Sequence, residues 1–331
     1  MSGQTQRILS ELPSGDPALL NRIAWARRWS ERRTSTEYAL AAREKALDGT
    51  GRRSEAEQGL ALRTLGWQAM WRGDLKLSMD YCLRAESHLS ESEYPEARAC
   101  LYANLATLHY FRNRLDLATC AIDRGIWLMG EDEASPALAE LVMTQAVVQR
   151  LAGERARAGI SLGRARELAQ DEIVPTIDAY TACWLVEDGD SGKAETHAKA
   201  ALSASQTMVN RVVMPYARAT LAVCHAMSGD FVEAVDQINT GLKHAKEDDD
   251  LRARCIVLIK SARIARLQKD EDKEFKVLRE AAEIAREQDF AMWRKQIALM
   301  RAELFEARGN YKAAVEQHKL AWALQKETRV R

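Results

Sequence analysis

The side chains that could do catalytic or metal chemistry are scattered along this sequence, at spacings that suit neither. Cys224 and His225 are adjacent on an expected helix, so they point in different directions and do not easily bind one metal together. None of the six cysteines forms a CxxC pair, the close spacing that a zinc site needs. The acidic run at 247–250 lacks calcium-loop spacing and is interpreted as a cap for a helix that begins at Leu251. We expect no metal site and no cofactor.

Motifs for nucleophilic, phosphate or dinucleotide chemistry are also absent from the sequence. It contains no GxSxG, HExxH, GxxxxGK[ST] or GxGxxG pattern. An enzyme stays open as an alternative only if Cys183 meets His109 and Glu140 across a groove. We therefore predict no catalytic residue, and cysteines that are mostly buried free thiols.

The charge balance of the chain argues against two classes of partner. Its 331 residues carry 48 Lys and Arg against 48 Asp and Glu, so no whole-molecule field attracts nucleic acid or acidic membrane. The basic stretch from Arg252 to Arg266 is diluted by nearby acidic residues and is interpreted as a solvated helix face. Neither a signal peptide nor an 18-residue apolar span is present, so we expect a cytoplasmic protein without a membrane span.

A two-residue turn signature recurs about every 40 residues and indicates how the chain is organised. Successive signatures are separated by 40, 40, 36, 40, 40 and 40 residues, and the short step falls at residues 171–175. A small residue stands seven positions before and twelve positions after each signature, which identifies a stacked helical repeat. The signatures are Gly73-Asp74, Asn113-Arg114, Gly153-Glu154, Gly189-Asp190, Gly229-Asp230, Lys269-Asp270 and Gly309-Asn310.

The first complete unit shows the physics of the repeat. Apolar residues three and four apart make residues 61–71 helical. Gly73 can end that helix in the left-handed conformation, and Asp74 can cap a second helix over about 75–89. Gly66 and Ala85 are small, so the two helices can approach closely.

This pattern resembles the tetratricopeptide repeat (TPR), and Leu65, Gly66, Gly73, Asp74 and Ala85 carry the resemblance in the first unit. The resemblance implies an all-α fold, a right-handed α-α superhelical solenoid of about eight TPR-like helix pairs. We expect a tail at 1–16 and a degenerate first pair at 17–53, with helices at 17–30 and 35–47. Seven repeats are then expected at about 54–93, 94–133, 134–173, 174–210, 211–250, 251–290 and 291–331.

The resemblance also implies a concave groove lined by the first helix of each pair. Its predicted ligand- or peptide-binding residues are Arg63, Trp67, Trp71, Asn104, Thr107, Tyr110, Glu140, Arg150, Tyr180, Tyr216, Lys260, Arg263 and Glu303. In the alternative, the aromatic members simply pack inside a tight superhelix. The carboxylate clamp of some TPR domains is excluded, because Trp67, Glu140 and Thr144 replace three of its five residues and Glu140 would repel a carboxylate.

The predicted function is a non-catalytic protein- or peptide-binding TPR scaffold, a bacterial regulatory or signalling input module. The 40-residue unit resembles arrays found ahead of diguanylate cyclases and in peptide-pheromone receptors. The expected partner is a protein or peptide, and the last helices could meet a C-terminal effector domain or form a homo-oligomer. A constitutive assembly adaptor without a small ligand remains the main alternative.

Overall fold

The computed structural model describes residues 15–130, 135–207 and 210–326, and these residues form sixteen helices and no strand. The all-α prediction is therefore confirmed for the part of the chain that is described. Most of the expected N-terminal tail at 1–16 lies outside these residues, as do 327–331 of the last expected repeat.

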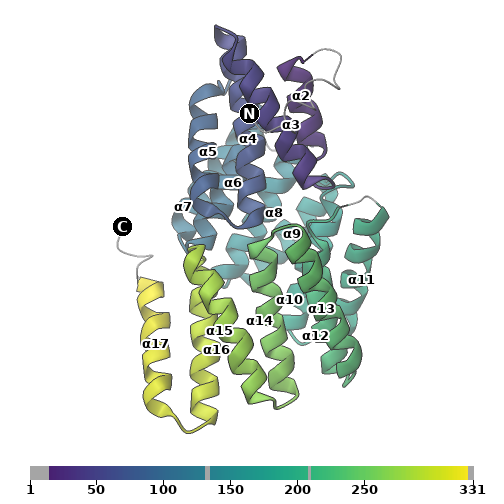
Figure 1. Ribbon diagram of the computed structural model, residues 1–331, viewed down its shortest axis with the longest axis vertical. Helices are drawn as coiled ribbons and strands as arrows, with labels where there is room; N and C mark the ends of the chain where they lie inside the picture. The colour runs from purple at the N-terminus through teal and green to yellow at the C-terminus, as the bar shows by residue number, and fades with distance from the viewer. Residues whose placement is uncertain (1–14, 131–134, 208–209, 327–331) are drawn as a thin grey trace. The chain divides into compact units, whose positions relative to one another are not determined.

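The helices follow one another through short turns, and Figure 1 shows them with their labels. Their bounds are α2 Pro17–Ala26, α3 Arg32–Leu47, α4 Arg52–Arg72, α5 Leu75–His88, α6 Pro95–Phe111, α7 Leu115–Met129, α8 Pro136–Leu151, α9 Arg155–Leu168, α10 Val174–Glu187, α11 Ser191–Thr207, α12 Met214–Met227, α13 Phe231–Glu247, α14 Leu251–Leu267, α15 Glu271–Glu287, α16 Ala291–Ala307 and α17 Tyr311–Lys326.

The turn signatures end one helix and begin the next, as their chemistry predicts. Gly73 has a φ of 97°, and its N–H bonds to the carbonyls of Ala69 and Met70. The Asp74 carboxylate then accepts a hydrogen bond from the Leu77 N–H at 3.0 Å, which caps α5. In the acidic run before α14, Asp250 accepts from the Ala253 N–H at 2.7 Å, so the predicted cap is confirmed.

The small residues of the repeat lie where two helices touch. Gly66 on α4 faces α5, and a Cβ added there would stand 2.9 Å from the Cys82 Sγ. Gly125 on α7 is tighter still, because its Cβ would lie 2.6 Å from the Leu141 side chain on α8. Real side chains do not approach so closely, so a larger residue at either position would force the helices apart.

The described residues divide into two compact units. Unit 1 holds those of 15–108, 116–173 and 210–212, and unit 2 holds those of 109–115, 174–207 and 213–326. One of the passages between the units lies between Ile173 and Val174, inside the one repeat step that is four residues short. At that junction α9 ends at Leu168 and α10 begins at Val174.

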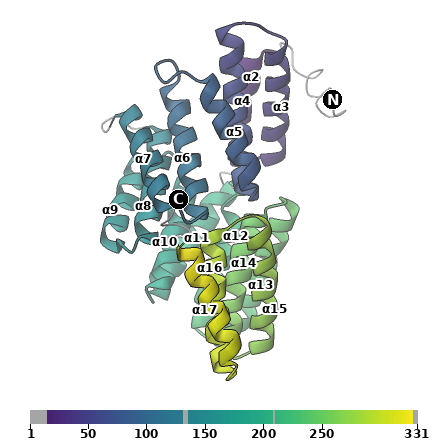
Figure 2. The ribbon, with the colours of Figure 1, turned by 90° about the vertical axis from the view of Figure 1, so that its left-hand side faces the viewer.

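Unit 1 begins with the helix pair α2 and α3, which Figure 2 shows beside α4 and α5. Helix α2 ends at Ala26, four residues before the predicted end at 30, and α3 begins at Arg32 rather than at 35. The difference has a local cause. The Arg28 N–H bonds to the Trp25 carbonyl at 3.3 Å, and its guanidinium donates to the same oxygen at 3.0 Å. These bonds close a tight turn where the helix was expected to continue.

The short segment at 109–115 contributes an aromatic residue, Phe111, to the core of unit 2. Phe111 packs against Phe290 and Trp293, with ring centroids 5.4 and 5.1 Å away. Helices α16 and α17 of this unit run side by side (Figures 1 and 2). Among the described residues, no helix is both long and apolar enough to cross a membrane.

Candidate functional site

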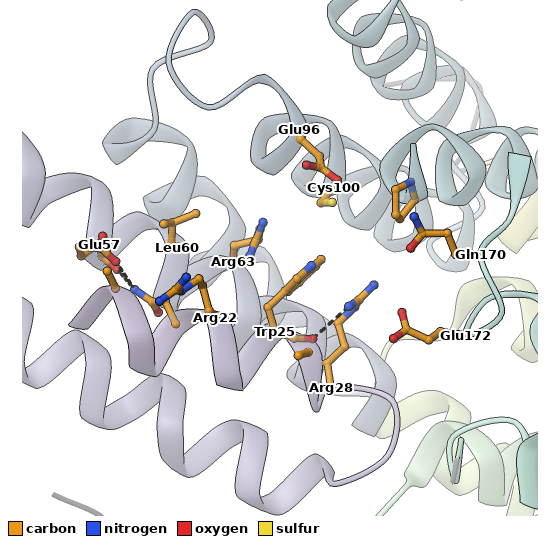
Figure 3. Close-up of a pocket in the computed structure, with 14 residues that line it drawn as sticks. Arg22, Trp25, Arg28, Glu57, Leu60, Arg63, Glu96, Cys100, Gln170 and Glu172 are labelled. Carbon is orange, nitrogen blue, oxygen red and sulfur yellow. Dashed lines mark hydrogen bonds between the residues drawn. The ribbon is translucent and has the colours of Figure 1, made fainter. Parts of the chain in front are cut away.

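A cavity of about 480 Å³ opens within unit 1, and Figure 3 shows it in close-up. Its walls come from α2, α4, α6, the first turn of α8 and the loop between α9 and α10. The first helices of four successive pairs thus contribute to one cavity. The lining residues are Ala18, Asn21, Arg22, Trp25, Ala26, Arg28, Glu57, Leu60, Arg63, Glu96, Cys100, Pro136, Gln170 and Glu172.

At the centre of the cavity an indole lies against two guanidinium groups. The Arg63 guanidinium carbon lies 3.7 Å from the centroid of the Trp25 ring, and that of Arg28 lies 4.0 Å from it. Arg28 is neutralised by Glu140 through a 3.0 Å ion pair in which both side chains are buried. One of the two cations on Trp25 therefore has a counterion inside the protein.

Arg63 differs from Arg28 because the structure gives it no ion pair among the described residues. Its side chain is only 8% exposed, and its Nε is buried without a hydrogen-bond partner there. The pKa of the Arg63 guanidinium is lowered to about 10, chiefly by burial; the nearby Arg28 also lowers it, while Cys100, Glu96 and Glu140 act in the opposite direction. Arg63 thus stays charged near neutral pH and lacks a close anion.

Helix α2 is fixed against α4 by polar contacts at the edge of the same cavity. The Asn21 amide nitrogen donates to the Glu57 carboxylate at 2.7 Å and to the Glu57 carbonyl at 2.9 Å. The Gln68 amide nitrogen on α4 donates to the Ser35 hydroxyl on α3 at 3.0 Å, outside the cavity. The Asn21–Glu57 contacts thus fix the part of α2 that carries Trp25 opposite Arg63.

Two of the predicted groove residues meet in this cluster. Arg63 lies on Trp25, and Glu140 pairs with Arg28 on the same ring. Sequence reasoning missed Trp25 and Arg28, because the first helix pair lacks the turn signature that set the register elsewhere.

Other predicted groove residues of unit 1 are packed in its interior. Trp67 is 1% exposed and meets the Trp29 ring edge-on, with centroids 4.7 Å apart. Trp71 lies 5.6 Å from both of those rings. This arrangement matches the alternative in which the aromatic residues pack within the helices. Asn104 and Thr107 are also buried, and Arg150 is half-buried.

The remaining predicted residues lie in unit 2 and do not enter the cavity. Lys260 is buried, and its ammonium donates to the Cys183 sulfur at 3.2 Å. Arg263 donates to the Val186 carbonyl at 3.3 Å. The exposed Glu303 is paired with Arg266.

The other three predicted residues of unit 2 are tyrosines: Tyr110, Tyr180 and Tyr216. Tyr110 is buried, and its pKa is raised well above the usual value by burial and by the neighbouring Tyr180. Tyr180 and Tyr216 are half-buried. The Arg252 guanidinium carbon lies 5.8 Å from the Tyr216 ring centroid.

The chemistry of the cavity favours binding rather than bond making. Burial raises the pKa of the Cys100 thiol to about 12, so the one sulfur in the cavity wall is protonated at neutral pH and is a poor nucleophile. Across the described residues, no group of three His, Cys, Asp or Glu is arranged to hold a metal ion. What the cavity offers a ligand is a guanidinium, an indole face and a few polar groups.

Comparison with known proteins identifies no family by sequence but does identify the fold. No protein-family profile and no curated protein matches the chain. Among solved structures, the Rap conjugation gene regulator of plasmid pLS20, in complex with the Phr* peptide, is similar at a TM-score of 0.65 and 12% identity. That match covers 95% of each chain.

Two further structures extend the comparison. Aspartyl phosphate phosphatase F from Bacillus subtilis has a TM-score of 0.57 and 11% identity, over 97% of this chain and 86% of that one. A signal-transduction ATPase with a tetratricopeptide repeat sensor, from Pyrococcus horikoshii, has a TM-score of 0.51 and 13% identity, over 96% of this chain and 49% of that one. The resemblance to TPR proteins is thus confirmed for the fold.

Proposed function

We propose that this chain is a non-catalytic regulatory module that binds a peptide or protein segment, with the unit 1 cavity as its ligand site. One observation carries the proposal: a cavity of about 480 Å³ lined by an indole, a buried cation and a few polar side chains, on the first helices of a repeat array. Pockets of this size with few convergent polar groups are typical of ligand sites.

The similar structures support a regulatory role. The structure of the Rap regulator of plasmid pLS20 is a complex with the Phr* peptide, and the Pyrococcus horikoshii repeat array is described as a sensor. A bacterial signalling module in the cytoplasm, with a peptide as its ligand, is consistent with both. Of the predicted groove residues outside the cavity, the exposed Glu303 is proposed to contact a protein partner.

Catalysis is the less favoured function although one similar structure is named as a phosphatase. Burial raises the pKa of Cys183 above its usual value, and Lys260, which lowers it, does not offset that effect. Glu140, the third member of the alternative site, is already paired with Arg28. A thiol that stays protonated and a carboxylate that is already neutralised do not make a nucleophile and base pair.

A protein-binding adaptor remains the second candidate because α17 exposes apolar side chains. Tyr311 is 69% exposed and Trp322 is 60% exposed, while Ala314 and Ala321 of the same helix are buried. Such a surface could meet an effector domain or a second copy of the chain, as expected for the last helices.

Purification from the native host, followed by mass spectrometry of bound material, distinguishes the two functions. A receptor carries a peptide, and the substitution Trp25→Ala reduces the amount retained because it removes one wall of the cavity. Arg84→Met serves as the control, because Arg84 is exposed, lies outside the cavity and forms an exposed ion pair with Asp80 at 3.3 Å. If a protein co-purifies, no peptide is found and Trp25→Ala has no effect, the adaptor function replaces the proposed one.

A further inference from the structure

We propose that the unit 1 cavity binds a carboxylate group through Arg63, with Trp25 against the apolar part of the same ligand. This inference rests on the proposed binding function and specifies the chemistry of its ligand. The carboxylate could belong to a peptide C-terminus, an acidic side chain or a small organic acid, and the experiment below separates these sources.

The first step is the contrast between Arg63 and another arginine of unit 1 with the same exposure. Arg98 is also 8% exposed, but it pairs with Glu91 at 3.0 Å and with Glu86 at 3.2 Å. Buried charges in proteins are normally paired in this way. Arg63 has no such partner among the described residues, and it faces a cavity. An anion supplied by a ligand would complete the pair.

The second step is geometry. One face of the Arg63 guanidinium lies on the Trp25 ring, so its N–H groups point outward around the edge. Its Nε is without a hydrogen-bond partner in the described part of the chain. An arginine edge presents two parallel N–H donors, which match the two oxygens of a carboxylate. Figure 3 shows the Arg63 side chain next to Trp25, in the same cavity as Glu96 and Cys100.

The third step is charge, which favours a single negative charge over two. Glu57, Glu96 and Glu172 line the cavity beside Arg22, Arg28 and Arg63. With Arg28 paired to Glu140, two arginines and three glutamates remain in the lining, so the cavity as a whole is slightly acidic, although Arg63 itself has no ion pair among the described residues. A monoanion can pair with Arg63 and is repelled less by these carboxylates than a phosphate dianion would be.

The same ion pair corrects one inference from the sequence. Glu140 was expected to repel a carboxylate, but its charge is neutralised by Arg28 at 3.0 Å in a buried pair. The objection therefore does not apply at Arg63. The cavity is also larger than a carboxylate, so the ligand must carry further atoms, and the Trp25 face and Leu60 provide apolar contact for them.

Affinity selection with three synthetic peptide pools tests the inference. The first pool is amidated and contains no Asp or Glu, the second has the same composition with a free C-terminus, and the third is amidated but contains Asp and Glu. Each pool is offered to the wild-type protein, Arg63→Met, Arg63→Lys and the control Arg84→Met. Acetate, phenylacetate and inorganic phosphate are tested separately by thermal shift.

The expected result is retention from the second or third pool only, and these two pools distinguish a C-terminus from an acidic side chain. Arg63→Met should weaken binding about 10- to 100-fold, the usual range for losing one charge-assisted pair, and Arg63→Lys should restore part of it. Arg84→Met should bind as the wild type does.

The other outcomes separate this inference from the proposed function. Equal retention from all three pools, unchanged by Arg63→Met, overturns the carboxylate inference but leaves a peptide-binding module. An Arg63-dependent shift with phenylacetate but no retained peptide supports the inference and overturns the peptide function. A shift with phosphate alone, or no response to any probe, overturns the carboxylate inference.

Discussion

Replacing Arg63 with methionine should make the ligand-free protein more stable, although it removes a buried and well-packed side chain. Burial lowers the pKa of Arg63 to about 10. That value lies roughly 2.5 units below the value for an exposed arginine, which at about 1.36 kcal/mol per unit corresponds to a cost of roughly 3 kcal/mol for keeping the charge in the folded state. Methionine removes this cost and fills a similar volume.

The gain is reduced by the contact that Arg63 makes with Trp25. A cation on an aromatic ring is worth about 0.5–2 kcal/mol, so the net stabilisation from Arg63→Met is expected to be about 1–2.5 kcal/mol. For a unit of this size, that corresponds to a rise in melting temperature of roughly 2–10 °C. Arg98→Met should do the opposite, because Arg98 is equally buried but ion-paired with Glu86 and Glu91, and the substitution removes both pairs.

The pH dependence of stability supplies an independent check. The folded-state pKa of Arg63 is depressed, so the unfolded chain keeps this proton to a higher pH. The cost of the buried charge is therefore fully present below pH 10, and it is relieved as the pH rises through the folded pKa. The difference in unfolding free energy between Arg63→Met and the wild type should be constant up to about pH 9 and shrink above it.

Thermal and urea denaturation of the wild type, Arg63→Met and Arg98→Met at neutral pH measures these effects. If Arg63→Met loses as much stability as Arg98→Met, then Arg63 already has a counterion in the protein. The interpretation of the cavity as a site that awaits an anion would then be wrong.

Two further predictions concern the repeat itself. Gly125→Ala should destabilise unit 1 by about 1–3 kcal/mol in urea denaturation, because the added Cβ would lie 2.6 Å from Leu141. Gly159→Ala, on a helix where nothing lies within 4 Å of the new Cβ, should instead be neutral or stabilise by up to about 1 kcal/mol, and equal losses would contradict the packing argument. Asp250→Ala should cost about 1 kcal/mol by removing the cap on the Ala253 N–H, and Asp250→Asn should recover most of it.

The fold could be predicted from the sequence because the small residues at helix–helix contacts recur with the period of the repeat. A glycine or alanine recurs wherever two helices touch, and the clash that a Cβ would make at Gly66 or Gly125 explains why. The caps recur for the same reason, since each second helix needs an acceptor for its first N–H groups. These local requirements repeat with the period, so one unit predicts the others.

The cavity could be predicted only in part. Alignment of the repeat units on the turn signature placed Arg63 and Glu140 in the predicted groove, but the alignment was not extended to the degenerate first helix pair. A parallel between two buried serines would have supplied it: Ser35 donates to the Ala24 carbonyl at 2.7 Å, and Ser78 donates to the Gly66 carbonyl at 2.8 Å. Aligning positions 24 and 66 puts Trp25 opposite position 67 and Asn21 opposite position 63, which are both groove positions.

Side-chain packing and pairing could not be predicted at all from the period. Trp67 and Trp71 stand at groove positions, yet both pack around Trp29. Trp29 follows α2, whose last turn ends earlier than the sequence suggests. The pairing of Arg28 with Glu140 joins residues 112 positions apart. Contacts of this kind depend on the position of α2, and the repeat pattern does not predict that position.

The most direct test of the account is to map where a selected peptide binds. Hydrogen exchange of the protein, with and without a peptide retained from the pools, reports which helices the peptide protects. Protection is expected on α2 and on α4 around Arg63, and it should disappear with Arg63→Met. A peptide that protects only α12 and α14, and that protects them equally in Arg63→Met, would contradict the assignment of the unit 1 cavity as the ligand site.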